Sequence, residues 1–404
     1  MSIDFSEGVC YDKFSKEYPG GGTGRNALMS SGKLELYIHL PFCVRKCSYC
    51  DFLSGNYGEE IRREYLKILQ QEIRQAASEV QDYRVATVYF GGGTPSLLSG
   101  GEIGTLMDCI AAGYSLKEDV EITMEGNPGT FTGQKLQGWK KAGVNRLSIG
   151  CQSVLNRELQ LLGRIHTFRE FQESFREARE AGFENINVDL MSGLPGQMPQ
   201  DWETSLRTIG ELGPEHISAY SLIVEEGTPF AEMDLQLPGE ELERQMYEDT
   251  EKVLAEYGYS RYEISNYASD GRECRHNIGY WKRENYLGFG LGAASLLENV
   301  RFSNRPDMEG YLKSKGEPAK LRQEIQRLSK QEQMEEFMFL GLRMTEGVSE
   351  EEFRRLFSCD IHEIYGDILE KYQRMQMLEC RDGRIFLTKQ GIFVSNPILA
   401  DFLL

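Results

Sequence analysis

The fold of this chain is decided by the stretch Leu36-Tyr-Ile-His-Leu-Pro-Phe-Cys43-Val-Arg-Lys-Cys47-Ser-Tyr-Cys50. A short apolar run that predicts a strand leads directly into three cysteines with the spacing C-x3-C-x2-C. A tight loop at the end of a strand can turn three thiolates toward one point. Three thiolates suit a 4Fe–4S cluster, in which each ligated iron takes one cysteine and one iron stays open. The open iron can chelate a small molecule that carries an amine and a carboxylate.

Two other interpretations of the three cysteines remain open from the spacing. They could be reduced, buried cysteines, or they could belong to a structural zinc site. Structural zinc sites are usually closed by four ligands, commonly arranged as two separated pairs. No second pair lies near in the sequence. The spacing therefore favours the cluster, with Cys43, Cys47 and Cys50 as its metal ligands.

The composition excludes several classes of protein. A length of 404 residues with 40% apolar residues suits a barrel-sized domain with one or two smaller ones. No apolar run reaches the ~20 residues of a membrane span, and the N-terminus lacks an apolar signal segment, so we expect a cytoplasmic protein. Nine cysteines are an odd number, which predicts thiols or ligands rather than a disulfide framework. A net charge of −18 opposes nucleic-acid binding as the main role.

Runs that predict a strand, each followed by a helical pattern, recur six times in the first part of the chain. They begin at Leu34, Val85, Val120, Asn145, Asn185 and His216. Six such units predict a parallel sheet covered by helices, and six falls short of the eight units of a closed barrel. We therefore predict an α/β fold built on a partial, TIM-like (β/α)6 barrel.

The chain divides into four predicted segments. Residues 1–33 form a glycine-rich arm, 34–235 the partial barrel, 236–325 an extension of the barrel, and 326–404 a separate domain. The polar stretch 322–335 predicts a linker helix. The order of elements in the last segment, three helices and a short hairpin, resembles a winged helix. Its acidic residues oppose contact with phosphates.

Polar or glycine-rich motifs follow the predicted strands. They are Gly91-Gly-Gly-Thr-Pro95, Glu125-Gly-Asn-Pro128, Gly150-Cys-Gln-Ser153 and Asp189-Leu-Met-Ser-Gly193. Barrels of this kind carry their chemistry at the C-terminal ends of the strands, so these motifs predict one shared site. Glycine lets a ligand approach the backbone closely because it has no Cβ. Taken singly, each polar residue could be an ordinary solvated or packed strand-end side chain.

The cysteine motif resembles that of the radical S-adenosylmethionine (SAM) family. In that family the open iron binds SAM, and an electron from the cluster cleaves it to a 5′-deoxyadenosyl radical. The order of all the motifs, with Leu162-Gly-Arg-Ile-His166 between them, is similar to that of the oxygen-independent coproporphyrinogen III oxidase family over about residues 34–300. The tail is similar to the C-terminal helical domain of that family. The resemblance implies a radical SAM barrel with a 4Fe–4S cluster and SAM as cofactors.

The resemblance also implies two groups of SAM contacts. The positions that contact cluster-bound SAM are Tyr37, Gly92, Glu125 and Ala294. The positions that hold a second SAM in the oxidase branch are Tyr49, Gly93, Thr94, Gln152, Arg164, Asp189 and Ile223. The oxidase branch has a fourth cysteine two residues after the third, where this chain has Phe52. Phe52 therefore argues against coproporphyrinogen oxidation and against a second SAM.

The segment His276-Asn-Ile-Gly-Tyr280-Trp281 fits the pattern H-N-x-x-Y-W. It resembles the heme-binding signature of the family's other branch, the HemW-type heme chaperones. An imidazole can ligate heme iron, and aromatic side chains can contact the macrocycle. The alternative is a hydrogen-bonded histidine beside a Tyr–Trp pair of the core. With the resemblance, His276 is the expected heme contact.

The function implied by the resemblance is that of a heme chaperone, which binds the cluster, SAM and heme and transfers heme to an acceptor protein. The alternative is an oxygen-independent coproporphyrinogen III oxidase, and a third class is a radical SAM enzyme with another substrate. Enzymatic activity stays open, and no catalytic residue is predicted. The expected partners are heme, an unidentified acceptor and a reductant such as flavodoxin or ferredoxin. The resemblance also allows a homodimer and peripheral contact with a membrane.

Overall fold

A twelve-stranded sheet forms the centre of the computed structural model, which describes residues 32–404. The predicted arm at 1–33 therefore lies outside the described residues, except for its last two positions. The strand order is β12-β11-β10-β9-β1-β2-β3-β4-β5-β6-β8-β7. The six strands in sequence order run parallel and are β1 (Lys33–Leu40), β2 (Arg84–Gly92), β3 (Ser115–Gly126), β4 (Arg146–Gln152), β5 (Ile186–Ser192) and β6 (His216–Ser221). The predicted α/β fold with a parallel sheet is confirmed.

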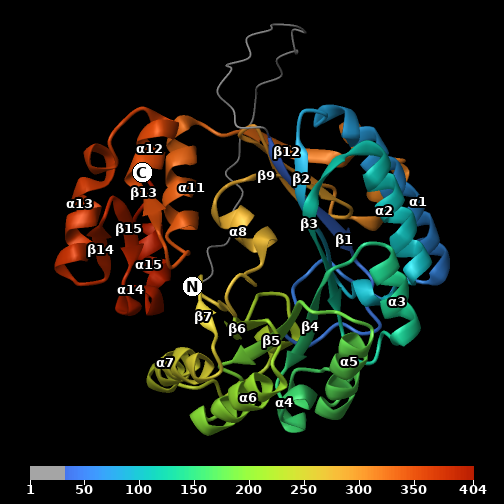
Figure 1. The fold of residues 1–404 in the computed structure, drawn as a ribbon, viewed down its shortest axis with the longest axis horizontal. Helices are drawn as coiled ribbons and strands as arrows, with labels where there is room; N and C mark the ends of the chain where they lie inside the picture. Colours follow the sequence, from blue (N-terminus) through green and yellow to red (C-terminus); the bar gives the residue numbers. More distant parts are fainter. Residues whose placement is uncertain (1–31) are drawn as a thin grey trace, which may run out of the picture.

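Helices cover the outer face of these parallel strands (Figure 1). They are α1 (Glu59–Ala76), α2 (Gly100–Gly113), α3 (Gly133–Lys141), α4 (Asn156–Leu161), α5 (Phe168–Glu180) and α6 (Pro199–Leu212). The sequence pattern does not predict α2, because its glycines lower helix propensity. Ser99 and Glu102 fix its start through a reciprocal capping box.

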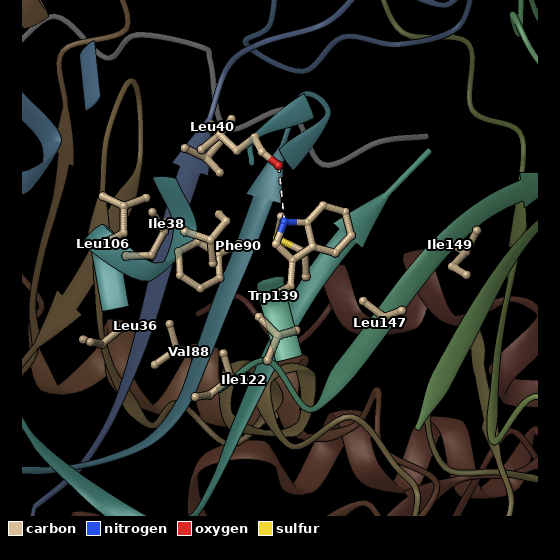
Figure 2. Packing of buried hydrophobic residues seen from close by; sticks show 14 of the residues in the cluster. Leu36, Ile38, Leu40, Val88, Phe90, Leu106, Ile122, Trp139, Leu147 and Ile149 are labelled. Atoms are coloured by element: carbon tan, nitrogen blue, oxygen red, sulfur yellow. Dashed lines mark hydrogen bonds between the residues drawn. The ribbon is translucent and has the colours of Figure 1, made fainter. Parts of the chain in front are cut away.

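The main hydrophobic core lies between the sheet and these helices (Figure 2). The side chains that fill it come from alternate strand positions and from helices, and include Leu36, Ile38, Val88, Phe90, Leu106 and Trp139. The indole nitrogen of Trp139 donates to the carbonyl of Leu98 (3.2 Å). Successive side chains of a strand point to opposite faces. The intervening positions, such as Tyr37 and Tyr89, therefore face the inner side of the sheet, where the candidate site lies.

The segment after β6 extends the same sheet at both ends. Strand β9 (Asn285–Phe289) pairs parallel with β1, and the antiparallel strands β10 (Ala294–Leu297), β11 (Val300–Asn304) and β12 (Arg322–Arg327) follow it. At the other edge lie β7 (Ser260–Arg261) and β8 (Asn266–Ala268). The helices of this region are α7 (Glu240–Glu256), α8 (Arg275–Trp281), α9 (Met308–Lys313) and α10 (Pro318–Leu321). Helix α8 lies on the inner, concave side of the sheet (Figure 1).

The predicted linker helix at 322–335 is wrong in its first half. Strand β12 occupies 322–327, and helix α11 (Lys330–Gly341) begins only after it. An edge strand with mostly exposed side chains needs few apolar residues, so its sequence lacks the alternation that marks a strand.

The C-terminal domain has a hydrophobic core of its own, formed around Phe353, Tyr365 and Leu369. It consists of α11, α12 (Glu350–Phe357), α13 (Ile361–Arg374), α14 (Lys389–Phe393), α15 (Ser395–Ala400) and a sheet of β13 (Val348–Ser349), β15 (Arg384–Leu387) and β14 (Leu378–Arg381). The predicted helical C-terminal domain is thus confirmed. Nowhere in residues 32–404 is a helix long and apolar enough to cross a lipid bilayer.

Candidate functional site

The cysteine loop, residues 43–50, follows the C-terminal end of β1. Backbone hydrogen bonds connect it to two distant segments. The amide of Ser48 donates to the carbonyl of Leu162 (3.0 Å), and the amide of Phe230, in the short 3-10 helix Pro229–Glu232, donates to the carbonyl of Ser48 (3.0 Å). The loop therefore keeps its shape through contacts with the segments that follow β4 and β6.

The three thiols of this loop are half-buried, and none forms a disulfide. The Sγ of Cys43 lies 3.5 Å from the hydroxyl of Thr94. The guanidinium of Arg164 donates to the Sγ of Cys47 (3.8 Å). Burial raises the pKa of the Cys50 thiol to about 11. The sulfur atoms of Cys43 and Cys47 thus each have a polar side chain beside them.

The donor set of the loop fits an iron–sulfur cluster. No group of three His, Cys, Asp or Glu side chains in the described part of the chain encloses a single metal ion. A cluster does not need such a group, because each cysteine ligates a different iron. The residues that would hold it are Cys43, Cys47 and Cys50.

The glycines after β2 run directly beside the cysteine loop. A Cβ on Gly93 would lie 3.1 Å from the Sγ of Cys43 and 2.8 Å from the carbonyl of Phe42. Gly92 has a φ of +113°, and a Cβ there would lie 2.6 Å from the ring of His39. Both positions need glycine because a side chain would occupy the space around the thiols and β1.

Glu125 lies near the end of β3, buried and in contact with two donors. The hydroxyl of Tyr89 donates to its Oε1 (2.9 Å), and the amide of Gly92 donates to its Oε2 (3.2 Å). Burial raises the pKa of Glu125 to about 7; the charge of Asp189 raises it further, while both donors lower it. The structure thus brings Gly92 and Glu125 together, as the resemblance implies.

Tyr37 belongs to the same group. Its ring stacks on Tyr89 with 6.2 Å between centroids, and its hydroxyl is hydrogen-bonded to Nδ1 of His39 (3.0 Å). The Nε2 of His39 donates to the carbonyl of Leu53 (2.8 Å), so Nδ1 is the acceptor. Tyr89 is a residue that the sequence did not select.

Asn127 joins the second group of predicted contacts. Its side chain donates to the hydroxyl of Thr94 (2.9 Å) and accepts from the guanidinium of Arg164 (2.8 Å). Arg164 also donates to the carbonyl of Gly150 (2.7 Å). The sequence analysis did not select Asn127, although it stands two positions after Glu125 at the same strand end.

Gln152 ends β4 with a φ of +69°, a left-handed conformation that is uncommon outside glycine. Such backbone strain is found most often at functional sites. Two positions earlier, a Cβ on Gly150 would lie 2.9 Å from Nε2 of Gln152 and 3.1 Å from Nη2 of Arg164. Because Gly150 has no side chain, the side chains of Gln152 and Arg164 can occupy the space beside it.

Asp189 and Tyr49 complete this inner group. The amide of Asn187 donates to a carboxylate oxygen of Asp189 (2.6 Å), and burial raises the pKa of Asp189. Tyr49, in the cysteine loop, packs against a small cluster that includes Leu162 and Phe230. Two other predicted contacts have exposed side chains, namely Ile223 after β6 and Ala294 at the start of β10.

His276 lies in α8, away from the cysteine loop, and is only 2% exposed. Its Nδ1 is hydrogen-bonded to the hydroxyl of Thr87 (2.7 Å), and its Nε2 to the hydroxyl of Tyr280 (3.0 Å). The ring stacks on Tyr89 with 5.0 Å between centroids. Burial, with the charge of Arg146, lowers the pKa of His276 to about 3. Neither nitrogen is free for iron, so this arrangement does not fit a heme ligand.

Comparison with known proteins assigns both parts of the chain. Residues 37–209 match the radical SAM superfamily, and residues 328–394 match the HemN C-terminal domain. The heme chaperone HemW of Bacillus subtilis is 37% identical over 372 residues, which cover 91% of this chain and 98% of that protein. HemW of Haemophilus influenzae is 34% identical, with 92% and 98% covered.

The structure is similar to that of HemN, the coproporphyrinogen III oxidase of Escherichia coli, with a TM-score of 0.81 and 22% identity over 92% of this chain and 90% of that one. This likeness confirms the fold. Sequence identity above 30% over nearly the whole of two HemW proteins assigns the family more specifically than the structural likeness does. The chain therefore belongs to the HemW family within the radical SAM superfamily.

Proposed function

We propose that this protein is a heme chaperone, which carries a 4Fe–4S cluster and SAM and transfers heme to an acceptor protein. The observation that carries the proposal is the similarity to HemW proteins over about nine-tenths of this chain. Phe52 supports it, because the oxidase branch has a cysteine at this position.

In this proposal Cys43, Cys47 and Cys50 hold the cluster, which supplies single electrons to the bound SAM. Arg164 donates to the sulfur of Cys47, and the hydroxyl of Thr94 lies 3.5 Å from the sulfur of Cys43, so both can stabilise negative charge on the sulfur atoms. Such donors raise the potential at which a cluster accepts an electron.

The chain offers SAM a mixed set of contacts. Glu125 supplies a buried carboxylate for the amine, and the glycine backbone of β2 allows close approach. Tyr37 lies close to Glu125, because its ring stacks on Tyr89, which donates to Glu125. Thr94, Asn127 and Arg164 already bond to one another, and together with Phe52 this argues against a second SAM.

Heme ligation by His276 would require its Nε2 to exchange the Tyr280 hydroxyl for iron. If that exchange takes place, His276→Ala weakens heme binding and shifts the Soret band. An unchanged heme titration would remove His276 from the proposal while leaving the chaperone function in place.

The partners proposed with this function are a reductant such as flavodoxin or ferredoxin, a second copy of the chain, and a membrane surface. Copurification with the reductant, the mass in solution and vesicle flotation test these three separately.

The rival function is oxidative decarboxylation of coproporphyrinogen III. The deciding experiment supplies cluster-reconstituted protein with coproporphyrinogen III, SAM and a reductant without oxygen, and measures protoporphyrinogen. Multiple-turnover product would overturn the chaperone proposal. No product from protein that holds a full cluster and binds heme stoichiometrically supports it.

A further inference from the structure

A cleft opens beside Cys47, between the cysteine loop and the segment that joins α4 to α5. Its walls include Val44, Arg45, Arg164, Ile165 and His166. Of these, the resemblance assigns a role to Arg164 alone. Among the residues that line the cleft, His166 says most about which ligand could bind there.

His166 is 5% exposed, and neither of its ring nitrogens forms a hydrogen bond of ordinary geometry. Buried polar groups without partners are rare in folded proteins, because losing water without replacement is unfavourable. Burial and the charge of Arg164 lower the pKa of His166 to about 4, and the Cys151 backbone and Glu170 offset this only in part. The side chain is therefore a neutral imidazole that can both donate and accept at the wall of the cleft.

Arg164, beside it, is a half-buried cation that forms no ion pair with a carboxylate of the described residues. It donates to Cys47, to the amide oxygen of Asn127 and to the carbonyl of Gly150, and its Nε has no partner. It forms no ion pair with any residue in 32–404. Cys47 and Asp189 supply part of the negative charge that compensates this cation, and a guanidinium also matches a carboxylate in geometry. The base of the cleft is therefore suited to a carboxylate.

The rim of the cleft is apolar and basic. Val44 is 51% exposed and Ile165 is 50% exposed. Arg45 is also exposed, and it donates to the carbonyl of Gly163 (2.6 Å) while its charge remains at the surface. A ligand that matches both parts has an apolar body and a carboxylate at one end. Heme has this form; SAM also carries a carboxylate that the arginines attract, although they repel its sulfonium, so the test must separate the two ligands.

We propose that this cleft binds a propionate of heme, with His166 as a contact beside Arg164. The inference rests on the proposed function, since it locates the carboxylate end of the ligand. It leaves the ligand of the heme iron open.

The test uses full-length, cluster-reconstituted protein and compares heme with heme dimethyl ester, in which both carboxylates are blocked. The unmodified protein should bind heme at least about tenfold more tightly than the ester, the size expected for a hydrogen bond to a charged group. His166→Phe keeps an aromatic ring but loses both nitrogens, and should abolish most of that preference. His166→Gln, which can donate and accept, should restore part of it.

Two control substitutions address folding and surface effects. His362→Phe changes an exposed histidine of the C-terminal domain and should leave the preference unchanged. Ile165→Glu places a carboxylate on the exposed rim and should weaken binding of heme more than of the ester, even if the His166 variants fold poorly. The matched control is Ile325→Glu on the exposed face of β12, which should have no effect.

Each outcome has one meaning. Equal affinity of the unmodified protein for heme and its ester overturns the inference, as does a preference that survives in His166→Phe. A parallel arm compares SAM with decarboxylated SAM, which keeps the sulfonium and the amine and lacks only the carboxylate. If His166→Phe alters only that comparison, the cleft holds the SAM carboxylate and the heme assignment is wrong. Protein that binds neither heme nor ester refutes the proposed chaperone function itself.

Discussion

His166 and His276 are both buried, and both stand in a motif shared with one family, yet their surroundings are opposite. Both ring nitrogens of His276 form hydrogen bonds, one with the hydroxyl of Thr87 and one with the hydroxyl of Tyr280. Neither ring nitrogen of His166 forms a hydrogen bond of ordinary geometry, and the residue lines a cleft. Burial lowers the pKa of both, so burial does not distinguish them. The hydrogen bonding of the ring nitrogens distinguishes the two residues. Both nitrogens of His276 are occupied by hydroxyls of the protein, whereas both nitrogens of His166 are unpaired and can bind a ligand.

The same contrast separates the two regions around these histidines. Next to the His276 ring, Tyr89 connects His276 to Glu125 by a ring contact and a hydrogen bond, whereas the carboxylate of Glu35 and the indole nitrogen of Trp281 have no hydrogen-bond partner. Around the cysteine loop, Cys43, Cys47 and Arg164 have polar partners, while Nε of Arg164 and both ring nitrogens of His166 have none. A polar group that is already hydrogen-bonded stabilises the fold, and an unpaired polar group at the wall of a cleft can bind a ligand.

The largest expected difference between the two regions is in iron content. Replacing Cys43, Cys47 and Cys50 by Ala should abolish the reconstituted cluster, because no other described thiol lies in that loop. Cys274, buried next to His276, should be replaceable by Ala without loss of iron. Iron and sulfide analysis measures both. Four irons in the triple variant would invalidate the site.

The next difference is in stability. His276→Ala leaves a cavity and two hydroxyls without their partner, and should lower the free energy of unfolding by about 2–4 kcal/mol. His166→Ala also leaves a cavity but breaks no hydrogen bond of ordinary geometry, so it should lower the free energy of unfolding by less than His276→Ala does. Guanidinium denaturation of cluster-free protein measures both. Equal losses would contradict the distinction drawn between the two histidines.

A pH dependence should appear on the SAM side. Because burial raises the pKa of Glu125 to about 7, the carboxylate forms as the pH rises through 7. If it binds the amine of SAM, affinity should increase roughly tenfold from pH 6 to pH 8, and Glu125→Gln should flatten the curve. Tyr89→Phe removes a donor that lowers this pKa, so the midpoint should move to higher pH. A wild-type curve that is flat over this range would exclude Glu125 as the amine contact.

The smallest effect concerns the segment beside the cysteine loop. Gly163 has a φ of +72°, and a Cβ there would lie 2.8 Å from Oγ of Ser48. Gly196 has a nearly equal φ of +71° with nothing within 4 Å, so Gly196→Ala measures the backbone strain alone. Each alanine should cost about 1 kcal/mol from its backbone conformation. Gly163→Ala should lower the free energy of unfolding by up to about 1 kcal/mol more than Gly196→Ala and should slow cluster reconstitution. Identical behaviour of the two variants would show that the side chain of Ser48 moves to accommodate the new methyl group.

The sequence predicts the parallel strands well because their apolar runs are determined by local burial. It does not predict β12, whose place at a sheet edge depends on pairing with β11 rather than on its own residues. In the site, the cysteines and the glycine motif follow from spacing. Asn127 and Tyr89 do not, because their roles come from partners such as Arg164 and Glu125 that only the folded chain brings near.

The neighbours of β1 have a consequence for the order of biosynthesis. This strand lies between β2 and β9, and β9 ends at Phe289, far along the chain. The cysteine loop likewise depends on Leu162 and Phe230. Proteins are synthesised from the N-terminus, so the three thiols leave the ribosome long before the segments that shape their loop. Iron can therefore be received in a finished site only after translation has passed β9, and the nascent thiols must stay reduced until then.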